Sequence, residues 1–236
     1  MPLPVLPPAY NLVALEREID AFERAVRAAP RGVDDGTVYW TDRGDRLRLA
    51  VVLEPEAPAA ATLEAVHVLT VATGDALGAL LPPAKPVAFA WPGHVLLDGA
   101  NLGRVRAALA PTVGSEAVPP WLVLGLELAV ASLGADPGRF VDRTSLCDEG
   151  AGEVTVTALM ESVARHFLHW TGRWLDDGFG PVRTAWNRRC FRRGEEGEIV
   201  LGDHRLAGPI EGLAEDGAFV IAGQRLHLVA HLDSVG

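Results

Sequence analysis

Residues 89–99, Phe-Ala-Trp-Pro-Gly-His-Val-Leu-Leu-Asp-Gly, constrain the fold of this chain more than any other stretch. An apolar run leads into a Trp-Pro-Gly turn, and a second apolar run follows it. Proline cannot donate to a sheet ladder and glycine tolerates a positive φ, so we expect the chain to reverse at Pro92 and Gly93. The stretch therefore predicts two strands joined by a tight turn, with the rest of the chain packed around them.

Helical and strand patterns alternate along the chain up to about residue 192. Apolar residues recur at helical spacing from Leu15 to Val26, which predicts an amphipathic helix that ends at Pro30-Arg31-Gly32. The same criteria predict strands over 39–40, 46–53 and 121–130, a strand that ends at residue 91, and helices over 59–81 and 156–174. This mixture predicts an α+β fold in which helices cover a mixed β-sheet.

From Glu198 onward the pattern changes to short alternating strands. Gly-Asp at 202–203 and Asp-Gly at 216–217 separate apolar runs, which is a hairpin signal, and the last strand is expected over 225–232. The pattern predicts a small β-barrel. We therefore expect one domain over residues 10–192 and a second over 195–236.

Composition limits the classes of function. The net charge is −10, and Lys85 is the only lysine, so a nucleic-acid partner is not expected, because phosphate neutralisation needs clustered cations. No apolar stretch approaches about 18 uninterrupted residues and no signal-peptide pattern opens the chain, which predicts a cytoplasmic protein without a membrane segment. Cys147 and Cys190 are too few for a disulfide framework and are expected to be inert. His166 and His169 have no third ligand, so no metal site is expected.

Several motifs carry a family resemblance. Residues 90–94, Ala-Trp-Pro-Gly-His, resemble the Lys-Trp-Pro-Asn-Asp segment of biotin protein ligases. Thr144-Ser145-Leu146 and Gly178-Phe179-Gly180-Pro181 resemble later motifs of that family, and the glycine and aspartate pattern of residues 202–218 is similar to its SH3-like terminal domain. The order and spacing of these motifs cover the chain from about Leu12. The resemblance implies a class II biotin/lipoate ligase-like domain followed by a small SH3-like β-barrel.

The charged groups of the family's active site are replaced in this chain. Ala90 stands in the lysine slot and His94 in the acidic slot of the motif. The arginine-rich loop of the family is matched, counting back from Trp40, by residues 32–38, which contain Asp34 and Asp35 and no arginine. Lys85 cannot stand in for the missing lysine, because side chains alternate along a strand and residue 85 lies on the opposite face from residue 90.

The resemblance also implies which residues surround a ligand pocket. Arg104 falls where the family has a glycine, and it either fills the pocket or supplies a relocated cation. Gly125 is kept on a strand whose glycines line the biotin pocket in the family, whereas Glu127 replaces the second glycine and is expected to pair with an arginine such as Arg104. The expected pocket residues are Trp40, Trp91, Pro92, Gly93, His94, Arg104, Gly125 and Glu127.

Three functions stay open from the sequence. The family condenses biotin or lipoate with ATP and passes the acyl group to a lysine of a carrier protein. This chain is either a ligase that uses relocated cations such as Arg31, Arg104 or Arg106, or a non-catalytic relative that binds an acyl group or a carrier domain, or a transferase of preformed acyl groups. ATP and biotin or lipoate are expected as cofactors only if the family chemistry is retained. A small carboxylic acid, a biotin or lipoyl carrier domain and a second copy in a weak homodimer are the expected partners.

Overall fold

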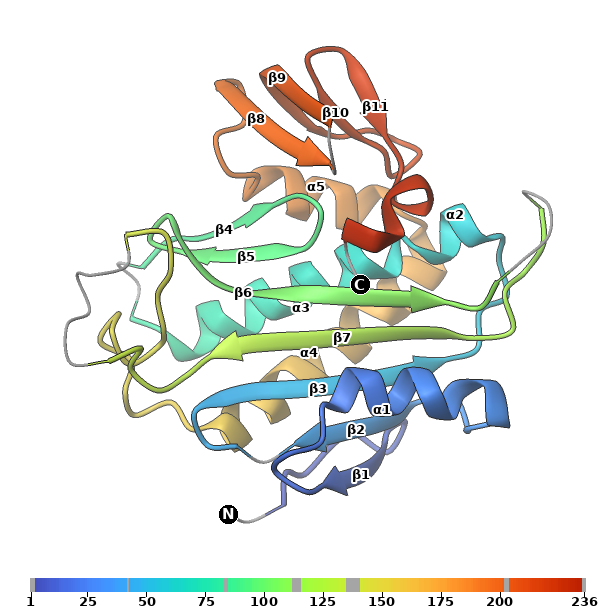
Figure 1. Ribbon diagram of the computed structural model, residues 1–236, viewed down its shortest axis with the longest axis vertical. Helices are drawn as coiled ribbons and strands as arrows, with labels where there is room; N and C mark the ends of the chain where they lie inside the picture. Colours follow the sequence, from blue (N-terminus) through green and yellow to red (C-terminus); the bar gives the residue numbers. More distant parts are fainter. Residues whose placement is uncertain are drawn as a thin grey trace.

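The computed structural model describes residues 3–41, 43–82, 85–111, 116–134, 141–201 and 204–234. Its centre is a seven-stranded sheet with the order β1-β2-β3-β7-β6-β5-β4, in which β1 and β2 pair in parallel and the other neighbours are antiparallel (Figure 1). The strands are β1 (Asn11–Leu15), β2 (Thr37–Thr41), β3 (Arg46–Leu53), β4 (Val87–Ala90), β5 (His94–Leu97), β6 (Ala100–Leu109) and β7 (Leu122–Ala129). The predicted mixed sheet with covering helices is confirmed.

Helices lie on both faces of this sheet. One face packs against α3 (Ala65–Leu80) and α4 (Val156–Asp177), with the short α2 (Ala59–Thr62) and α5 (Gly180–Arg188) beside them. The opposite face carries α1 (Ala21–Ala28), which packs on β2, β3 and β7 and leaves β6 uncovered in Figure 1. We call this second side the open face of the sheet.

The first predicted helix is wrong at its start. Leu15 belongs to β1, and α1 begins only after Asp20, whose side chain accepts a hydrogen bond from the backbone N–H of Glu23. An aspartate at this position satisfies a free helical N–H and fixes the first turn. The apolar spacing before Asp20 reflects a strand and a turn, which periodicity alone did not separate from a helix.

Helix α3 forms the centre of the core. Together α2 and α3, residues Ala59–Leu80, are long and apolar enough to cross a bilayer by length and composition. However, 72% of the apolar 18-residue stretch within them is buried inside the protein. The buried side chains of α3 pack between the sheet and α4. Its apolar character is therefore that of a core helix, which has apolar residues all round.

The C-terminal region is a four-stranded antiparallel sheet with the order β11-β10-β9-β8. Its strands are β8 (Glu196–Leu201), β9 (His204–Leu213), β10 (Phe219–Ile221) and β11 (Gln224–Leu226). The strand expected over 225–232 is too long, because Leu228–Ser234 forms 3₁₀ turns, and the turn expected at 202–203 lies outside the described residues. The sheet is compatible with an SH3-like domain, while its closure as a barrel and the division at 10–192 and 195–236 stay predictions.

The two sheets share one hydrophobic core. Trp91, at the end of β4, stacks on Phe219 of β10 with ring centroids 5.7 Å apart, and Trp186 of α5 meets the same ring edge-on at 6.0 Å. Trp91 and Trp186 are both almost fully buried. The hairpin around Pro92 therefore connects the main sheet to the C-terminal sheet.

Candidate functional site

One row of side chains crosses the open face from β4 to β3. Ala90 pairs with His94 and His94 with Arg104, and the row continues through Glu127 to Arg48. Directly opposed residues of neighbouring strands point to the same side of a sheet. The register therefore brings Ala90, His94, Arg104 and Glu127 together.

Glu127 is held by two arginines of β3. Its Oε1 accepts hydrogen bonds from Arg46 Nη1 at 2.6 Å and from Arg48 Nη2 at 3.0 Å. Burial opposes ionisation of Glu127, but these hydrogen bonds outweigh it and hold its pKa below the usual value. The expected pair between Glu127 and an arginine is present, but Arg104 is not the partner: β7 has two neighbouring strands, and both arginines come from β3 and not from β6.

Arg104 keeps its charge unpaired. Among the described residues, no carboxylate lies within 4 Å of its guanidinium group, which is largely exposed. Its neighbour His94 is half-buried, and burial lowers the pKa of His94, with the positive charge of Arg104 acting in the same direction. His94 is therefore neutral at pH 7, so Arg104 is the free charge at this point of the row.

A pocket of about 280 Å³ opens beside Arg104. Among the described residues of its wall, Arg46, Arg104 and Arg143 supply three guanidinium groups, and Glu127 supplies one carboxylate. The described residues that line it are Arg46, Asn101, Leu102, Gly103, Arg104, Glu127, Ala129, Leu133, Arg143 and Thr144. This excess of positive charge in a concave, partly apolar site favours an anionic ligand.

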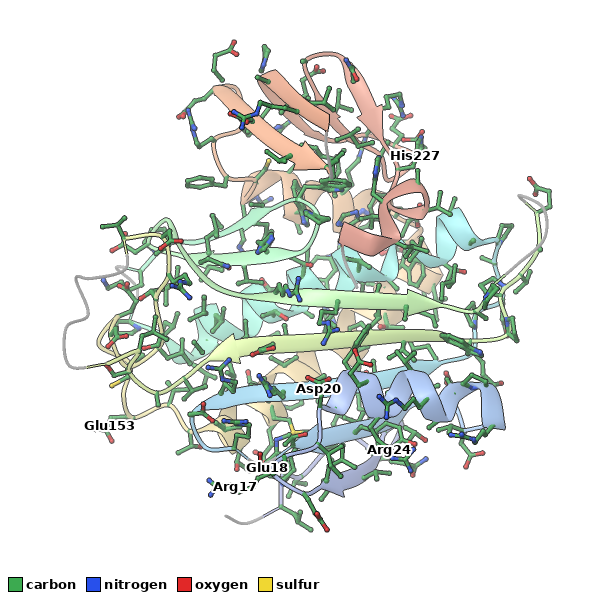
Figure 2. The ribbon with its side chains drawn as sticks, in the orientation of Figure 1. Arg17, Glu18, Asp20, Arg24, Glu153 and His227 are labelled. Atoms are coloured by element: carbon green, nitrogen blue, oxygen red, sulfur yellow. The ribbon has the colours of Figure 1, made fainter. Side chains whose placement is uncertain are left out.

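The space above Gly125 is filled. A Cβ atom at Gly125 would lie 2.6 Å from the Phe22 ring, so only glycine allows this contact. The Arg106 guanidinium carbon lies 4.1 Å from the centre of the same ring, and Arg106 pairs with Asp20, labelled in Figure 2, and with Glu23. The remaining hollow measures about 10 Å³, which is room for one water molecule. We call Phe22 and Arg106 the plug.

The structure separates the other expected pocket residues from this face. Trp40 and Trp91 are 1% and 5% exposed and point into the core between the sheet and its helices. Pro92 and Gly93 form the turn between β4 and β5, where Gly93 packs against the backbone of Val105. Side chains alternate between the two faces along a strand, so Ala90 reaches the open face, whereas its neighbour Trp91 and the core residue Trp40 do not.

Lys85 and Asp35, two charged residues that were compared with the charged residues of the family, do not line the pocket. Lys85 pairs with Glu149 at 2.6 Å and with Asp98 at 3.2 Å. Asp35 accepts a hydrogen bond from the backbone N–H of Glu54 at 2.9 Å, which ties its loop to the end of β3. Neither group supplies charge to the row on the open face.

Sequence reasoning missed Phe22, Arg46, Asn101 and Arg143 as residues of this site. The available signal for Arg46 was the period-two alternation of Arg46-Leu47-Arg48-Leu49, which places both arginines on one face of a strand. For Phe22 there was no such signal, because its apolar spacing is that of any core-facing helical residue. Its contact with Gly125 is visible only in three dimensions.

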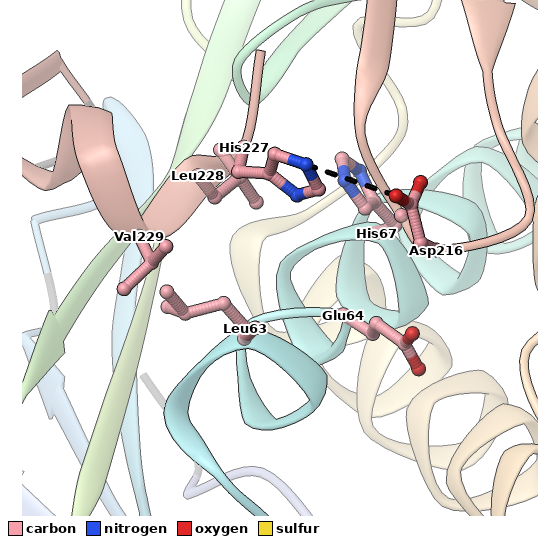
Figure 3. Close-up of a pocket in the computed structure, with 9 residues that line it drawn as sticks. Leu63, Glu64, His67, Asp216, His227, Leu228 and Val229 are labelled. Carbon is pink, nitrogen blue, oxygen red and sulfur yellow. Dashed lines mark ion pairs between the residues drawn. The ribbon is translucent and has the colours of Figure 1, made fainter. Parts of the chain in front are cut away.

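A second, small hollow lies between α3 and the C-terminal sheet (Figure 3). His67 of α3 is fully buried there, and burial lowers its pKa to about 3. Asp216 and His227 approach within 3.7 Å of one another beside it, and Glu64 lines the same hollow. With a volume of about 10 Å³, this hollow is a packed contact between elements and has no room for an organic ligand.

Comparison with known proteins places the chain in a family. Residues 6–188 match the Biotin/lipoate A/B protein ligase family. The chain is 30% identical over 188 residues to the biotin--[acetyl-CoA-carboxylase] ligase of Paracoccus denitrificans, covering 78% of this chain and 77% of that protein.

Solved structures agree with this match. A biotin protein ligase-like protein of unknown function from Silicibacter sp. TM1040 is 33% identical, with a TM-score of 0.86 over 97% of this chain and 99% of that chain. The apo biotin protein ligase of Aquifex aeolicus is 19% identical and shares the fold, with a TM-score of 0.75 over 92% and 96% of the two chains. The chain therefore belongs to the biotin/lipoate A/B protein ligase family.

Proposed function

We propose that this family member binds a small carboxylic acid in the arginine-lined pocket and does not convert it to an acyl-adenylate. The unpaired guanidinium of Arg104 at the pocket wall is the observation that carries this proposal. A planar guanidinium offers parallel N–H donors that match a carboxylate. An anion at this position gives Arg104 the partner that no described side chain supplies.

The cations that an adenylate needs are committed elsewhere. Of the three arginines that could replace the family's cations, Arg31 donates to the backbone oxygen of Arg27 at 2.6 Å, and Arg106 belongs to the plug. Only Arg104 remains, and Ala90 supplies no charge at the head of the row. Stabilising the charge that develops on a transferred phosphate requires several preorganised cations. At the pocket, Arg46 is paired with Glu127 and Arg143 with Asp142, so Arg104 is the described arginine left for a ligand, which supports carboxylate binding better than nucleotide chemistry.

The plug opposes a ligand with a bicyclic ring. In the family, the glycines of the strand that corresponds to β7 line the biotin pocket, and here Phe22 occupies the space above Gly125. Only about 10 Å³ remains next to it. The adjacent pocket of about 280 Å³ is at the lower limit of ligand sites, roughly 300 Å³. This volume suits a short acyl chain.

A ligase with Arg104 as its relocated cation is the second candidate. Two observations favour it: the excess of guanidinium groups among the described residues of the pocket, and the similarity to the biotin--[acetyl-CoA-carboxylase] ligase of Paracoccus denitrificans. Transfer of a preformed acyl group has less support. Burial raises the pKa of the Cys190 thiol to about 11, so this cysteine is not a thiolate at neutral pH. A carrier-domain partner, a weak homodimer and a cytoplasmic location stay predictions from family membership and composition.

Titration calorimetry with octanoate, lipoate and biotin, each with and without ATP, tests the proposal. We expect octanoate to bind without ATP, biotin not to bind, and Arg104→Gln to abolish acid binding. Arg205→Gln, on the exposed surface of β9, is the matched control and should bind as the parent does. Pyrophosphate release by the parent that Arg104→Gln abolishes would instead establish the ligase.

A further inference from the structure

We infer that His94 is a second group of the acid site and that its ring takes up a proton when an acid binds to Arg104. The acid is therefore bound more tightly at lower pH. The inference rests on the proposed function and concerns the regulation of the same site. It is carried by the position of His94 directly opposite Arg104 in the pairing of β5 with β6.

The sheet register places His94 next to the cation that receives the ligand. Directly opposed residues of antiparallel strands point to the same face and have Cβ atoms about 4.5–5.5 Å apart. The imidazole of His94 and the side chain of Arg104 therefore share the open face. The positive charge of Arg104 already acts on the His94 ring, so the negative charge of an anion bound to Arg104 acts on it as well.

The described surroundings of His94 supply no counter-charge for an imidazolium. On β4 the opposed residue is Ala90, which carries no charge, and on β6 the groups that act on the ring are Asn101 and Arg104. Glu127 lies one strand further, on β7, and is paired with two arginines of β3. A proton on His94 therefore gains a counter-charge when an acid is bound.

Binding of the acid changes the causes that set the pKa of His94. In the free protein, burial lowers this pKa most, a hydrogen bond with the Asn101 side chain opposes burial, and the charge of Arg104 adds to the lowering. A carboxylate on Arg104 neutralises that charge and also attracts the imidazolium directly. The pKa of His94 therefore rises on binding, and a ring that was neutral gains a proton.

Proton binding and acid binding are coupled in both directions. If the acid raises the affinity of His94 for a proton, the proton raises the affinity of the site for the acid by the same factor. A rise of about one pKa unit corresponds to at most about a tenfold change in acid affinity. Between pH 7.5 and 5.5 we therefore expect binding to become about three- to tenfold tighter.

Titration calorimetry with octanoate and 1-octanesulfonate at pH 7.5 and 5.5 tests this coupling on the intact chain. The sulfonate stays ionised over this range, so a change in its affinity reports a change in the protein. We expect tighter binding at pH 5.5 with net proton uptake, measured from the binding enthalpy in buffers of different ionisation enthalpy. His94→Gln should bind the sulfonate equally at both pH values and without uptake. His169→Gln, at an exposed histidine of α4, is the control and should keep the pH dependence of the parent.

The outcomes separate the inference from the proposed function. If neither anion binds the parent at either pH, the proposed function is wrong and the inference is wrong with it. If the anions bind but the sulfonate shows no pH dependence or no proton uptake, the proposed function stands and the inference is overturned. A pH dependence that persists in His94→Gln also overturns it, because another group then takes up the proton.

An NMR titration of the His94 ring in the parent, with and without octanesulfonate, makes the test independent of the variant. The pKa of His94 should rise when the sulfonate is bound. An unchanged pKa at saturating sulfonate would overturn the inference even if His94→Gln does not fold.

Discussion

Phe22 and Arg104 have opposite effects on the open face of the sheet. Phe22 is buried to 6% exposure and closes the space above Gly125, whereas Arg104 leaves a charge beside the neighbouring pocket. Arg104 was expected at a pocket from the family resemblance, whereas the role of Phe22 was not expected from the sequence. Phe22 thus leaves only a small hollow above Gly125, while among the described residues Arg104 is a cation without a carboxylate partner at the larger pocket.

Phe22→Ala should destabilise the protein by about 3–5 kcal/mol, because it leaves a cavity between α1 and β7. Gly125→Ala should also destabilise the parent, since the new methyl group would meet the Phe22 ring at 2.6 Å. In the Phe22→Ala background the same change should cost much less, because the ring is gone. Urea unfolding measures this double-mutant cycle. Phe191→Ala, at an exposed phenylalanine, is the control and should stay within about 0.5 kcal/mol of the parent.

Ala90→Lys should not create adenylate chemistry. The new ammonium would lie beside His94 and one strand from Arg104, while Glu127 is already paired with Arg46 and Arg48. Like charges in a poorly screened site repel, so we expect a lower unfolding midpoint than for the uncharged control Ala90→Met. Pyrophosphate release from ATP with biotin or lipoate should stay at the parent level. A gain of release in Ala90→Lys alone would contradict the assignment of a binding function.

At the scale of elements, the pairing of β7 with both β3 and β6 determines the electrostatics of the site. Glu127 lies between Arg48 of β3 and Arg104 of β6 in the sheet. Its ion pairs are formed with Arg46 and Arg48 of β3, so Arg104 of β6 is left without this partner. The partner of Glu127 depends on which arginine side chains reach its carboxylate in the folded sheet. If Glu127 paired with Arg104, the charge of Arg104 would be neutralised. Because Glu127 pairs with β3, Arg104 keeps a positive charge at the pocket.

Glu127→Gln should lower stability by about 1–3 kcal/mol, because Arg46 and Arg48 lose their shared counter-charge at a site that is only 28% exposed. The same change should strengthen binding of the acid, since Glu127 is the one carboxylate among the described residues that line the pocket. Urea unfolding and calorimetry measure the two effects. Glu198→Gln removes an exposed ion pair with Arg205 and should change stability by less than about 1 kcal/mol. Equal losses of unfolding free energy for both variants would show that the ion pairs of Glu127 stabilise the fold no more than an exposed ion pair does.

Local patterns determined most of the fold in advance. Turn residues and the spacing of apolar residues predict several elements that the structure contains. These are the hairpin at Pro92, the strands over residues 46–53 and 121–130, and the long helix from Val156. The start of α1 and the last 3₁₀ segment did not, because short apolar runs suit a strand, a turn or a helix equally well. For the site, the parity of β4 placed Ala90 on one face and Trp91 on the other. The plug and the partner of Glu127 depend on contacts between distant strands and helices, which no local pattern encodes.

At the scale of the whole molecule, the C-terminal sheet completes the core of the main sheet. Phe219, Trp91 and Trp186 form one aromatic cluster, and His67 lies next to it on α3. The imidazole is buried in its neutral form. Protonation of His67 would place a charge inside this contact.

Stability should therefore fall as the pH is lowered from 7.5 to 5.5. The pKa of His67 is about 3 in the folded chain and 6.5 in the unfolded chain, so below pH 6.5 the unfolded state binds the extra proton. The loss over this window is about 1.4 kcal/mol for one histidine. Glu64, whose pKa is raised by burial, acts in the opposite direction at lower pH, and the pKa of Asp216 is held down by Arg225, which confines its effect to more acidic conditions.

Urea unfolding at several pH values measures this dependence. His67→Leu should flatten the profile between pH 7.5 and 5.5, because the leucine has no proton to gain. His169→Gln replaces an exposed histidine of α4 and controls for the loss of an imidazole as such. A profile of His67→Leu as steep as that of the parent would assign the pH dependence to other groups.

The contact between Phe22 and Gly125 restricts the order in which this chain can evolve. While Phe22 is present, position 125 can hold only glycine, because any larger residue collides with the ring. A lineage that had stopped binding a ring at this place would therefore keep the glycine as firmly as one that still bound it. Among relatives, the residue at position 22 distinguishes the two histories, and the glycine at position 125 does not. A return to the open pocket must begin at position 22.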